Sequence, residues 1–280
     1  MTLPHRDPGG AFRDRLSDAV RRNNSLLCIG LDPDPQLMPE LDVAFFNRSI
    51  IDATSDLVCA YKPNLAFYEA MGTEGQDALH ETISAIPKDI PVIGDAKRGD
   101  VGHTARAYAR ALFDVFGFDA VTVNPYLGFD SLEPFLEYPT RGVFVLCKTS
   151  NPGSQDFQGL PVGGDGAPLY ELVARRVQEW NVGGNMGLVV GATFPQELKR
   201  VREICPDMPL LIPGIGAQGG DLAWAVREGA DSRGEGAIIS ASRQVLYASR
   251  GQDFAARARD QARRLRDEIN QHREAALAGR

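Results

Sequence analysis

A regular alternation of short apolar runs and longer amphipathic segments constrains the fold of this chain more than any other feature. Eight runs rich in Val, Ile and Leu are separated by stretches with apolar residues at helical spacing. We expect strands at residues 26–33, 57–64, 91–97, 119–124, 142–149, 187–192, 209–215 and 236–241. Runs that are apolar throughout are typical of parallel strands covered on both faces. The pattern therefore predicts an α/β fold, either a (β/α)₈ barrel (TIM barrel) or a doubly wound open sheet.

The positions of the polar residues favour the barrel. Polar side chains occur at the carboxyl ends of the runs, at Asp32, Lys62, Asp95, Lys97, Asn124, Thr149, Ser150 and Arg243. The active sites of (β/α)₈ barrels are built at the rim that these strand ends form. We predict one barrel domain over residues 1–280, with covering helices at about 10–24 and 252–278 and a single helix at 65–86 after the second strand.

Composition narrows the classes of ligand and location. A chain of 280 residues with 43% hydrophobic side chains can bury a large core. A net charge of −7 argues against nucleic acid or anionic lipid as a partner, so an anionic ligand requires a local cluster of cations. No apolar stretch is long enough to span a membrane or resembles a signal peptide, so we expect a cytoplasmic protein without membrane contact. The four cysteines lack CxxC spacing and the four histidines are scattered, which predicts reduced thiols and no metal site.

The most informative segment is the run Gly-Asp-Ala-Lys-Arg-Gly-Asp at residues 94–100. Because side chains alternate along a strand, Asp95 and Lys97 should project from the same face as an ion pair. A glycine then allows the chain to turn and bring Asp100 near the ammonium group. Taken alone, the run is equally compatible with a surface ion pair followed by an Asp cap for a helix that begins near Val101.

Two later segments predict a phosphate site. The Gly-rich segment 213–220 follows strand seven, and Ser-Ala-Ser-Arg at 240–243 ends strand eight where a helix begins. Loops at these two places in a barrel often bind phosphate through backbone N–H groups, and the guanidinium of Arg243 adds a planar donor fork. The first segment also fits G-x-G-x-x-G, the dinucleotide fingerprint. That fingerprint belongs in the first βα unit and needs an acid after the next strand, where this chain has Ser-Ala-Ser-Arg.

Taken together, the motifs resemble those of one family. They are Tyr61-Lys62-Pro63-Asn64, Asp95-x-Lys97-x-x-Asp100, Thr149-Ser150-Asn151-Pro152-Gly153, Pro213-Gly-Ile-Gly-Ala-Gln218-Gly-Gly and Ser242-Arg243. In this order, and on strands two, three, five, seven and eight, they strongly resemble orotidine 5′-phosphate decarboxylase of the longer bacterial type. With Asp32 on strand one, the likeness runs from about residue 24 to about residue 250.

The resemblance implies removal of carbon dioxide from orotidine 5′-phosphate to give uridine 5′-phosphate, the last step of pyrimidine (UMP) biosynthesis, without a metal or an organic cofactor. It implies that Lys97 stabilises the C6 carbanion and donates the proton, beside Asp95, Lys62 and Asp100. The substrate-binding residues that it implies are Asp32 for the ribose, Ser150 for the pyrimidine, Gln218 and Arg243 for the phosphate, and also Thr104 and Pro213.

The resemblance also implies a homodimer. Residues at the positions of Asp100, Val101 and Thr104 reach into the neighbouring subunit's site in this family, so the two sites would be composite. The Gly-rich loop at 155–166 is a candidate lid over the base.

Simpler and alternative readings exist. Asp32 and Ser150 are also common turn residues, and Lys62 is also compatible with a plain rim cation. A related phosphosugar decarboxylase or aldolase shares the D-x-K-x-x-D pattern but uses magnesium, and a nucleotide-binding barrel without catalysis would keep the phosphate motifs. The Thr-Ser-Asn-Pro-Gly segment favours a pyrimidine over a sugar phosphate, and the intact Lys97 favours an enzyme.

Overall fold

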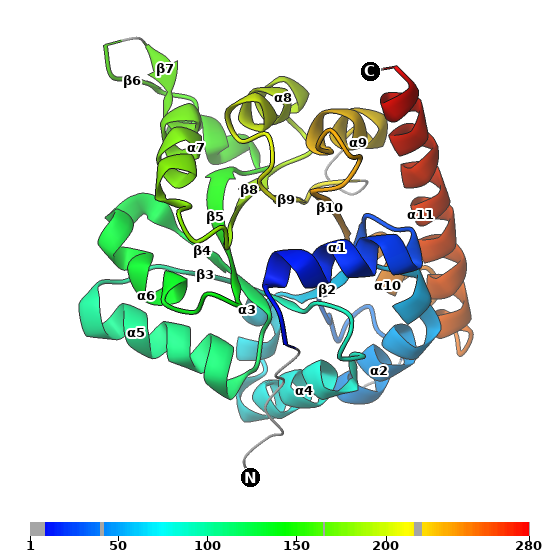
Figure 1. Ribbon diagram of the computed structural model, residues 1–280. Coiled ribbons are helices and arrows are strands. Elements are labelled where there is room, and N and C mark those ends of the chain that lie inside the picture. Colours follow the sequence, from blue (N-terminus) through cyan, green and yellow to red (C-terminus); the bar gives the residue numbers. More distant parts are fainter. Residues whose placement is uncertain (1–8, 40–41, 165, 216–219, 280) are drawn as a thin grey trace.

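The computed structural model describes residues 9–39, 42–164, 166–215 and 220–279 of the chain (Figure 1). Eight parallel strands form one sheet in the order β2-β1-β10-β9-β8-β5-β4-β3. Their bounds are β1 (Leu27–Leu31), β2 (Ala60–Pro63), β3 (Ile93–Arg98), β4 (Ala120–Val123), β5 (Gly142–Lys148), β8 (Met186–Val190), β9 (Leu210–Ile212) and β10 (Ala237–Ala241). All eight lie within or next to the apolar runs that predict them.

The sheet closes on itself. Isolated parallel bridges pair Tyr61 with Val92 and Asn64 with Asp95, so β2 and β3 meet at the seam. Helices surround the strands on the outside (Figure 1), and the strands are buried along almost their whole length. The predicted (β/α)₈ barrel is thus confirmed and the open sheet is excluded.

The α-helices lie at α1 (Phe12–Asn23), α2 (Val43–Thr54), α3 (Leu65–Glu69), α4 (Gly72–Ala85), α5 (Gly102–Arg110), α6 (Glu133–Leu136), α7 (Leu169–Trp180), α8 (Pro195–Ile204), α9 (Leu222–Gly229), α10 (Arg243–Leu246) and α11 (Phe254–Ala278). Shorter helical turns are η1 (Ser55–Leu57), η2 (Ala111–Val115), η3 (Pro125–Leu127), η4 (Phe129–Ser131) and η5 (Pro152–Asp156). The long α11 packs against α2 and α9 on the outside of the barrel.

Two predicted segments differ from the structure. The prediction of a single helix at 65–86 is wrong. The segment forms two helices, α3 and α4, and the second begins at Gly72, which has a φ of +65°. Gly75 lies so close to the Tyr68 carbonyl that a Cβ would come within 1.9 Å of its oxygen, which only glycine allows. The loop expected at 155–166 instead contains the end of η5 and the first strand of a small antiparallel hairpin, β6 (Pro161–Val162) with β7 (Ala167–Pro168). This hairpin projects from the barrel beside α7 (Figure 1).

Helix α1 covers the end of the barrel where the strands begin. Phe12 packs edge-to-face on Phe144 of β5, with ring centroids 5.7 Å apart. The guanidinium groups of Arg15 and Arg141 lie 2.9 Å and 3.2 Å from a carboxylate oxygen of the buried Asp119, which precedes β4. An ion network therefore seals this end beneath the core.

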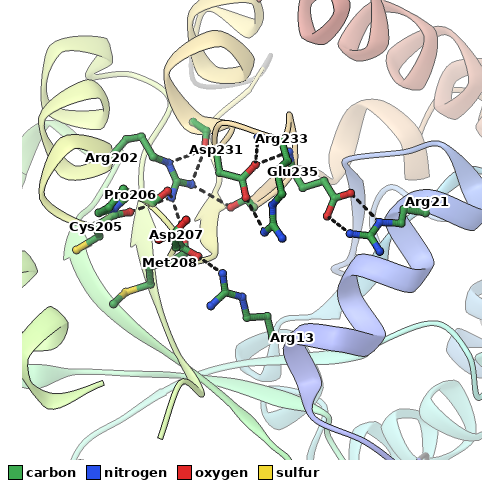
Figure 2. Close-up of polar contacts among 12 residues, drawn as sticks. Arg13, Arg21, Arg202, Cys205, Pro206, Asp207, Met208, Asp231, Arg233 and Glu235 are labelled. Atoms are coloured by element: carbon green, nitrogen blue, oxygen red, sulfur yellow. Dashed lines mark hydrogen bonds and ion pairs between the residues drawn. The ribbon is translucent and has the colours of Figure 1, made fainter. Parts of the chain in front are cut away.

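Arginines also join the loops that precede β9 and β10 (Figure 2). Arg13 donates to the Asp207 carbonyl (2.7 Å), and Arg21 pairs with Glu235 (2.9 Å). Arg202 donates to the backbone carbonyls of Cys205, Pro206, Met208, Gly229 and Gly236. Because these donors bond to backbone carbonyls of the loops at this end, they stabilise the turns there.

Other findings concern the cysteines and membrane contact. All four cysteines are buried and free. None of the described helices combines the length and apolar character that crossing a membrane requires. Among the residues that the structure describes, no three histidine, cysteine or acidic side chains gather as a metal-binding group would.

Candidate active site

A cavity of about 470 Å³ opens at the carboxyl ends of the barrel strands. Its size and position fit a small-molecule site of this fold. Seven of the ten residues predicted for the site line it, namely Asp32, Lys62, Asp95, Lys97, Ser150, Pro213 and Arg243. Gln218 lies outside the described residues, and Asp100 and Thr104 are not among the residues that line the cavity.

Asp95 is the centre of a charged network on one side of the cavity. One carboxylate oxygen accepts from the Lys62 ammonium at 2.8 Å, and the other accepts from the Lys97 ammonium at 2.6 Å. Lys62 and Asp95 are almost buried, whereas 47% of the Lys97 side chain is exposed. Within this network, Lys97 is therefore the accessible cation, and the Asp95 carboxylate fixes its position.

Charge and burial oppose each other in this network. Burial alone would raise the pKa of the Asp95 carboxyl, but the ammonium groups of Lys62 and Lys97 outweigh it and hold that pKa well below its usual range. Burial alone would lower the pKa of Lys62, but the carboxylates of Asp95 and Asp32 outweigh it and raise that pKa above its usual value. Both Lys62 and Asp95 are consequently charged at neutral pH.

The backbone of Lys97 adopts an unusual conformation. Its φ is +49°, in the left-handed region that residues with a Cβ rarely enter. The register between β3 and β4 shifts at this point, between Gly94 and Arg98. Thr122 of β4 accepts the Lys97 N–H at 2.9 Å and donates its hydroxyl to the Asp95 carboxylate at 2.9 Å. One buried hydroxyl thus fixes both the conformation of Lys97 and the orientation of Asp95.

Asp32 follows β1 and is held from two sides. Its Oδ2 accepts from the Ser242 hydroxyl at 2.6 Å, and its backbone carbonyl accepts from the Tyr247 hydroxyl at 2.8 Å. Its Oδ1 is buried and has no hydrogen-bond partner in the described part of the chain. A buried carboxylate oxygen left in this way is suited to accept hydrogen bonds from a ligand hydroxyl.

Ser150 lies in the segment after β5, close to the end of β8. A Cβ on Gly191 would lie 2.6 Å from the Cα of Ser150, so this close approach requires glycine. The Thr193 hydroxyl donates to the Ser150 carbonyl at 3.0 Å. The neighbouring Thr149 exchanges hydrogen bonds with the Gln158 side chain, at 2.8 Å and 3.0 Å. Segment 149–151 is therefore held in place on both sides.

Two of the residues predicted to bind phosphate, Pro213 and Arg243, lie after β9 and β10 and line the cavity. The Pro213 carbonyl accepts from the Ala192 N–H at 2.8 Å, and the next residue, Gly214, has a φ of +101°. Arg243 is the first residue of α10, and its exposed guanidinium makes no ion pair with any described residue. A cation at this place is available for an anionic group of a ligand.

The simpler interpretation of segment 94–100, in which Asp100 caps the next helix, is wrong. Its carboxylate accepts from the N–H of the next residue, Val101, at 2.8 Å. Helix α5 starts at Gly102, and its N-cap residue, Val101, offers no side-chain cap. Thr104 lies in the first turn of α5.

A sequence model of the orotidine 5′-phosphate decarboxylase / HUMPS family matches residues 25–258. The chain belongs to this family. A Dehalococcoides mccartyi protein named orotidine 5′-phosphate decarboxylase is 56% identical over 235 residues, which is 83% of this chain and 87% of that protein. The resemblance seen in the sequence is therefore confirmed.

Comparison with solved structures supports the same family. The structure of Leishmania donovani OMP decarboxylase matches with a TM-score of 0.85 and 45% identity, over 94% of this chain and 99% of that chain. Leishmania donovani UMP synthase matches with a TM-score of 0.85 and 46% identity, over 95% of this chain but only 57% of that longer chain. This family member therefore corresponds to one part of the longer protein.

Sequence reasoning missed some residues that shape the site. Thr122 is the one polar residue in the β4 segment Ala-Val-Thr-Val, and that interruption was the available signal. Tyr247 and Gly191 carried no signal, because their partners lie far away in sequence and are brought close only by the closed barrel.

Proposed function

We propose that this chain is a carboxy-lyase that converts orotidine 5′-phosphate to uridine 5′-phosphate in pyrimidine biosynthesis. The observation that carries the proposal is the buried Lys62–Asp95–Lys97 network, which presents one accessible ammonium group to the cavity. Relatives of this chain at 52–56% identity are named orotidine 5′-phosphate decarboxylase, which supports the same substrate.

The chemistry requires a cation and a proton at one carbon atom. When the bond from C6 to the carboxylate breaks, carbon dioxide leaves and the electron pair remains on C6. The ammonium of Lys97 stabilises this developing charge and then donates a proton to C6, and Lys97 recovers its proton from water. Asp95 orients the ammonium through the 2.6 Å contact. Because one side chain supplies both charge and proton, we propose a reaction that needs neither a metal nor an organic cofactor.

The remaining cavity residues fit the other parts of the nucleotide. The unpartnered Oδ1 of Asp32 is suited to a ribose hydroxyl, with Lys62 beside it. Ser150 lines the same cavity, and we propose that it recognises the amide edge of the pyrimidine. Arg243 is suited to the phosphate, together with Gln218 and the backbone after Pro213.

We also propose a homodimer with composite sites. Asp100 and Thr104 are not among the residues that line their own subunit's cavity, which suits side chains that complete a neighbour's site. Large apolar side chains are exposed on the adjoining loops, including Val101, Tyr126 and Leu127. Burying these side chains against a two-fold copy would remove apolar surface from water.

The proposal also covers the domain organisation and the location of the protein. We propose that residues 1–280 form one domain, because α1 and α11 both pack on the barrel strands or on the helices around them. A cytoplasmic location stays a prediction from the sequence.

One assay tests the proposed reaction against its alternatives. Purified protein should decrease the ultraviolet absorbance of orotidine 5′-phosphate, at the same rate after treatment with EDTA, and should not act on sugar phosphates. Lys97→Ala should abolish this turnover yet bind uridine 5′-phosphate nearly as well as wild type, because the ammonium acts mainly in the transition state. Loss of activity with EDTA, restored by magnesium, would favour the phosphosugar alternative. Binding without turnover in wild type would favour a non-catalytic barrel.

A further inference from the structure

Lys148, the last residue of β5, is a buried cation that the proposed mechanism does not use. Its side chain is 0% exposed, and it is not among the residues that line the active-site cavity. It forms no ion pair with a described residue. The carboxylate that influences it most is that of Glu197, and both residues line a second, smaller cavity of about 310 Å³.

Two contacts hold the Lys148 ammonium group. It donates a hydrogen bond to the buried Ser154 hydroxyl at 2.9 Å, and it lies 4.3 Å from the centroid of the Phe194 ring. Ser154 belongs to the segment after β5, and Phe194 belongs to the loop between β8 and α8. The ammonium thus joins two loops of the active-site rim.

The position is costly for a lysine. Burial lowers the pKa of Lys148, and Glu197 offsets this only in part. A buried ammonium without a paired carboxylate is less favourable than an apolar side chain of the same length. Methionine would fill this space without that cost, so fold stability does not account for the lysine.

The segment above Lys148 carries residues of the active-site cavity. Thr149, Ser150 and Asn151 all line that cavity. The chain then turns through η5 and comes back, so that the Gln158 side chain bonds to Thr149 and the Gln158 N–H donates to the Ser154 carbonyl at 2.9 Å. The hydrogen bond from Lys148 to Ser154 connects this turn to the end of β5.

We propose that Lys148 is a positioning residue that anchors segment 149–158 and so orders Ser150 for the substrate. This inference rests on the proposed function for the identity of the ligand. The contact between the ammonium and Ser154 substitutes for the apolar core that so short a segment lacks.

The test compares Lys148→Met with Lys199→Met, which removes an exposed lysine from the neighbouring helix α8. In Lys148→Met we expect amide hydrogen exchange over residues 149–158 and the KM for orotidine 5′-phosphate each to rise about tenfold or more, the size typical of losing a hydrogen bond to a charged group. We expect kcat to change less than about threefold and the Tm to stay level or rise. Lys199→Met should match wild type in every measurement.

Several results would overturn the inference. One is an unchanged KM and unchanged exchange in a folded Lys148→Met protein, and another is a lower Tm with normal kinetics, which would mean a purely structural role. If Lys148→Met does not fold, Ser154→Ala decides by the same measurements, because it removes the other half of the bond. If wild type does not decarboxylate orotidine 5′-phosphate, the proposed function fails, and the exchange measurement still decides whether Lys148 anchors the segment.

Discussion

Replacing Thr122 with valine removes one hydroxyl and keeps the shape of the side chain. Thr122 is buried in β4 and is not among the residues that line the cavity, so it does not contact the substrate. Its hydroxyl bonds to both the Asp95 carboxylate and the Lys97 N–H. The substitution therefore loosens the Asp95–Lys97 pair, the proposed catalytic pair, without removing a residue that lines the cavity.

The expected loss follows from these two bonds. Leaving a buried donor unsatisfied costs about 1–3 kcal/mol. The left-handed conformation of Lys97 costs a similar amount, about 1–3 kcal/mol, and persists only while surrounding contacts enforce it. We assume that the substitution destabilises the oriented conformation of Lys97 by the free energy of one such hydrogen bond, about 1–3 kcal/mol. Because roughly 1.36 kcal/mol corresponds to a factor of ten in rate, kcat should fall about 5- to 150-fold.

The assay measures kcat and KM for orotidine 5′-phosphate in Thr122→Val, with Thr122→Ser as the matched control that keeps the hydroxyl. We expect kcat to fall in the valine variant alone, and KM to stay within about threefold of wild type, since only the orientation of the lysine changes. A valine variant whose kcat lies within twofold of the serine variant would refute the role assigned to Thr122.

Three further predictions concern phosphate binding, pH and the dimer. Arg243→Ala should lower kcat/KM sharply for orotidine 5′-phosphate but hardly change the slow turnover of the phosphate-free nucleoside, and equal losses would place Arg243 elsewhere. The lowered pKa of Asp95 means that its charge contributes stability above about pH 3.9, which is lost as the pH falls through the folded-state pKa. Wild type should therefore lose stability on acidification more steeply than Asp95→Asn in urea unfolding, and parallel curves would contradict this. Lys97→Ala and Asp100→Ala subunits refolded together in equal amounts should regain about a quarter of wild-type activity, because half of the dimers are mixed and each mixed dimer holds one complete site. A mixture that stays inactive although mixed dimers form would rule out the shared site.

The architecture was readable from the sequence because parallel barrel strands are buried on both faces. Their apolar runs stand out, and charged residues such as Asp32 and Lys62 appear where several of these runs end. The predicted ion pair between Asp95 and Lys97 is confirmed by their 2.6 Å contact, although the backbone of Lys97 departs from a regular strand. Local patterns were sufficient for these features.

Features that depend on contacts between distant segments could not be predicted from the sequence. The break between α3 and α4 depends on how Gly75 packs against Tyr68, and helical spacing continues across the break. The left-handed backbone of Lys97 depends on Thr122 in the next strand and on a register shift that only the closed sheet reveals. The anchoring of segment 149–158 by Lys148 likewise depends on the position of Phe194.

Polar groups have different roles at the two ends of the barrel. Where the strands begin, Arg202 alone supplies donors to five backbone carbonyls, and Asp119 is paired with two arginines. Where the strands end, Asp32 has a buried oxygen without a partner among the described residues, and Lys97 has a strained backbone. Such groups raise the free energy of the free protein. A ligand that supplies the missing partners binds to groups already held in place, so little of its binding free energy is spent on ordering the site.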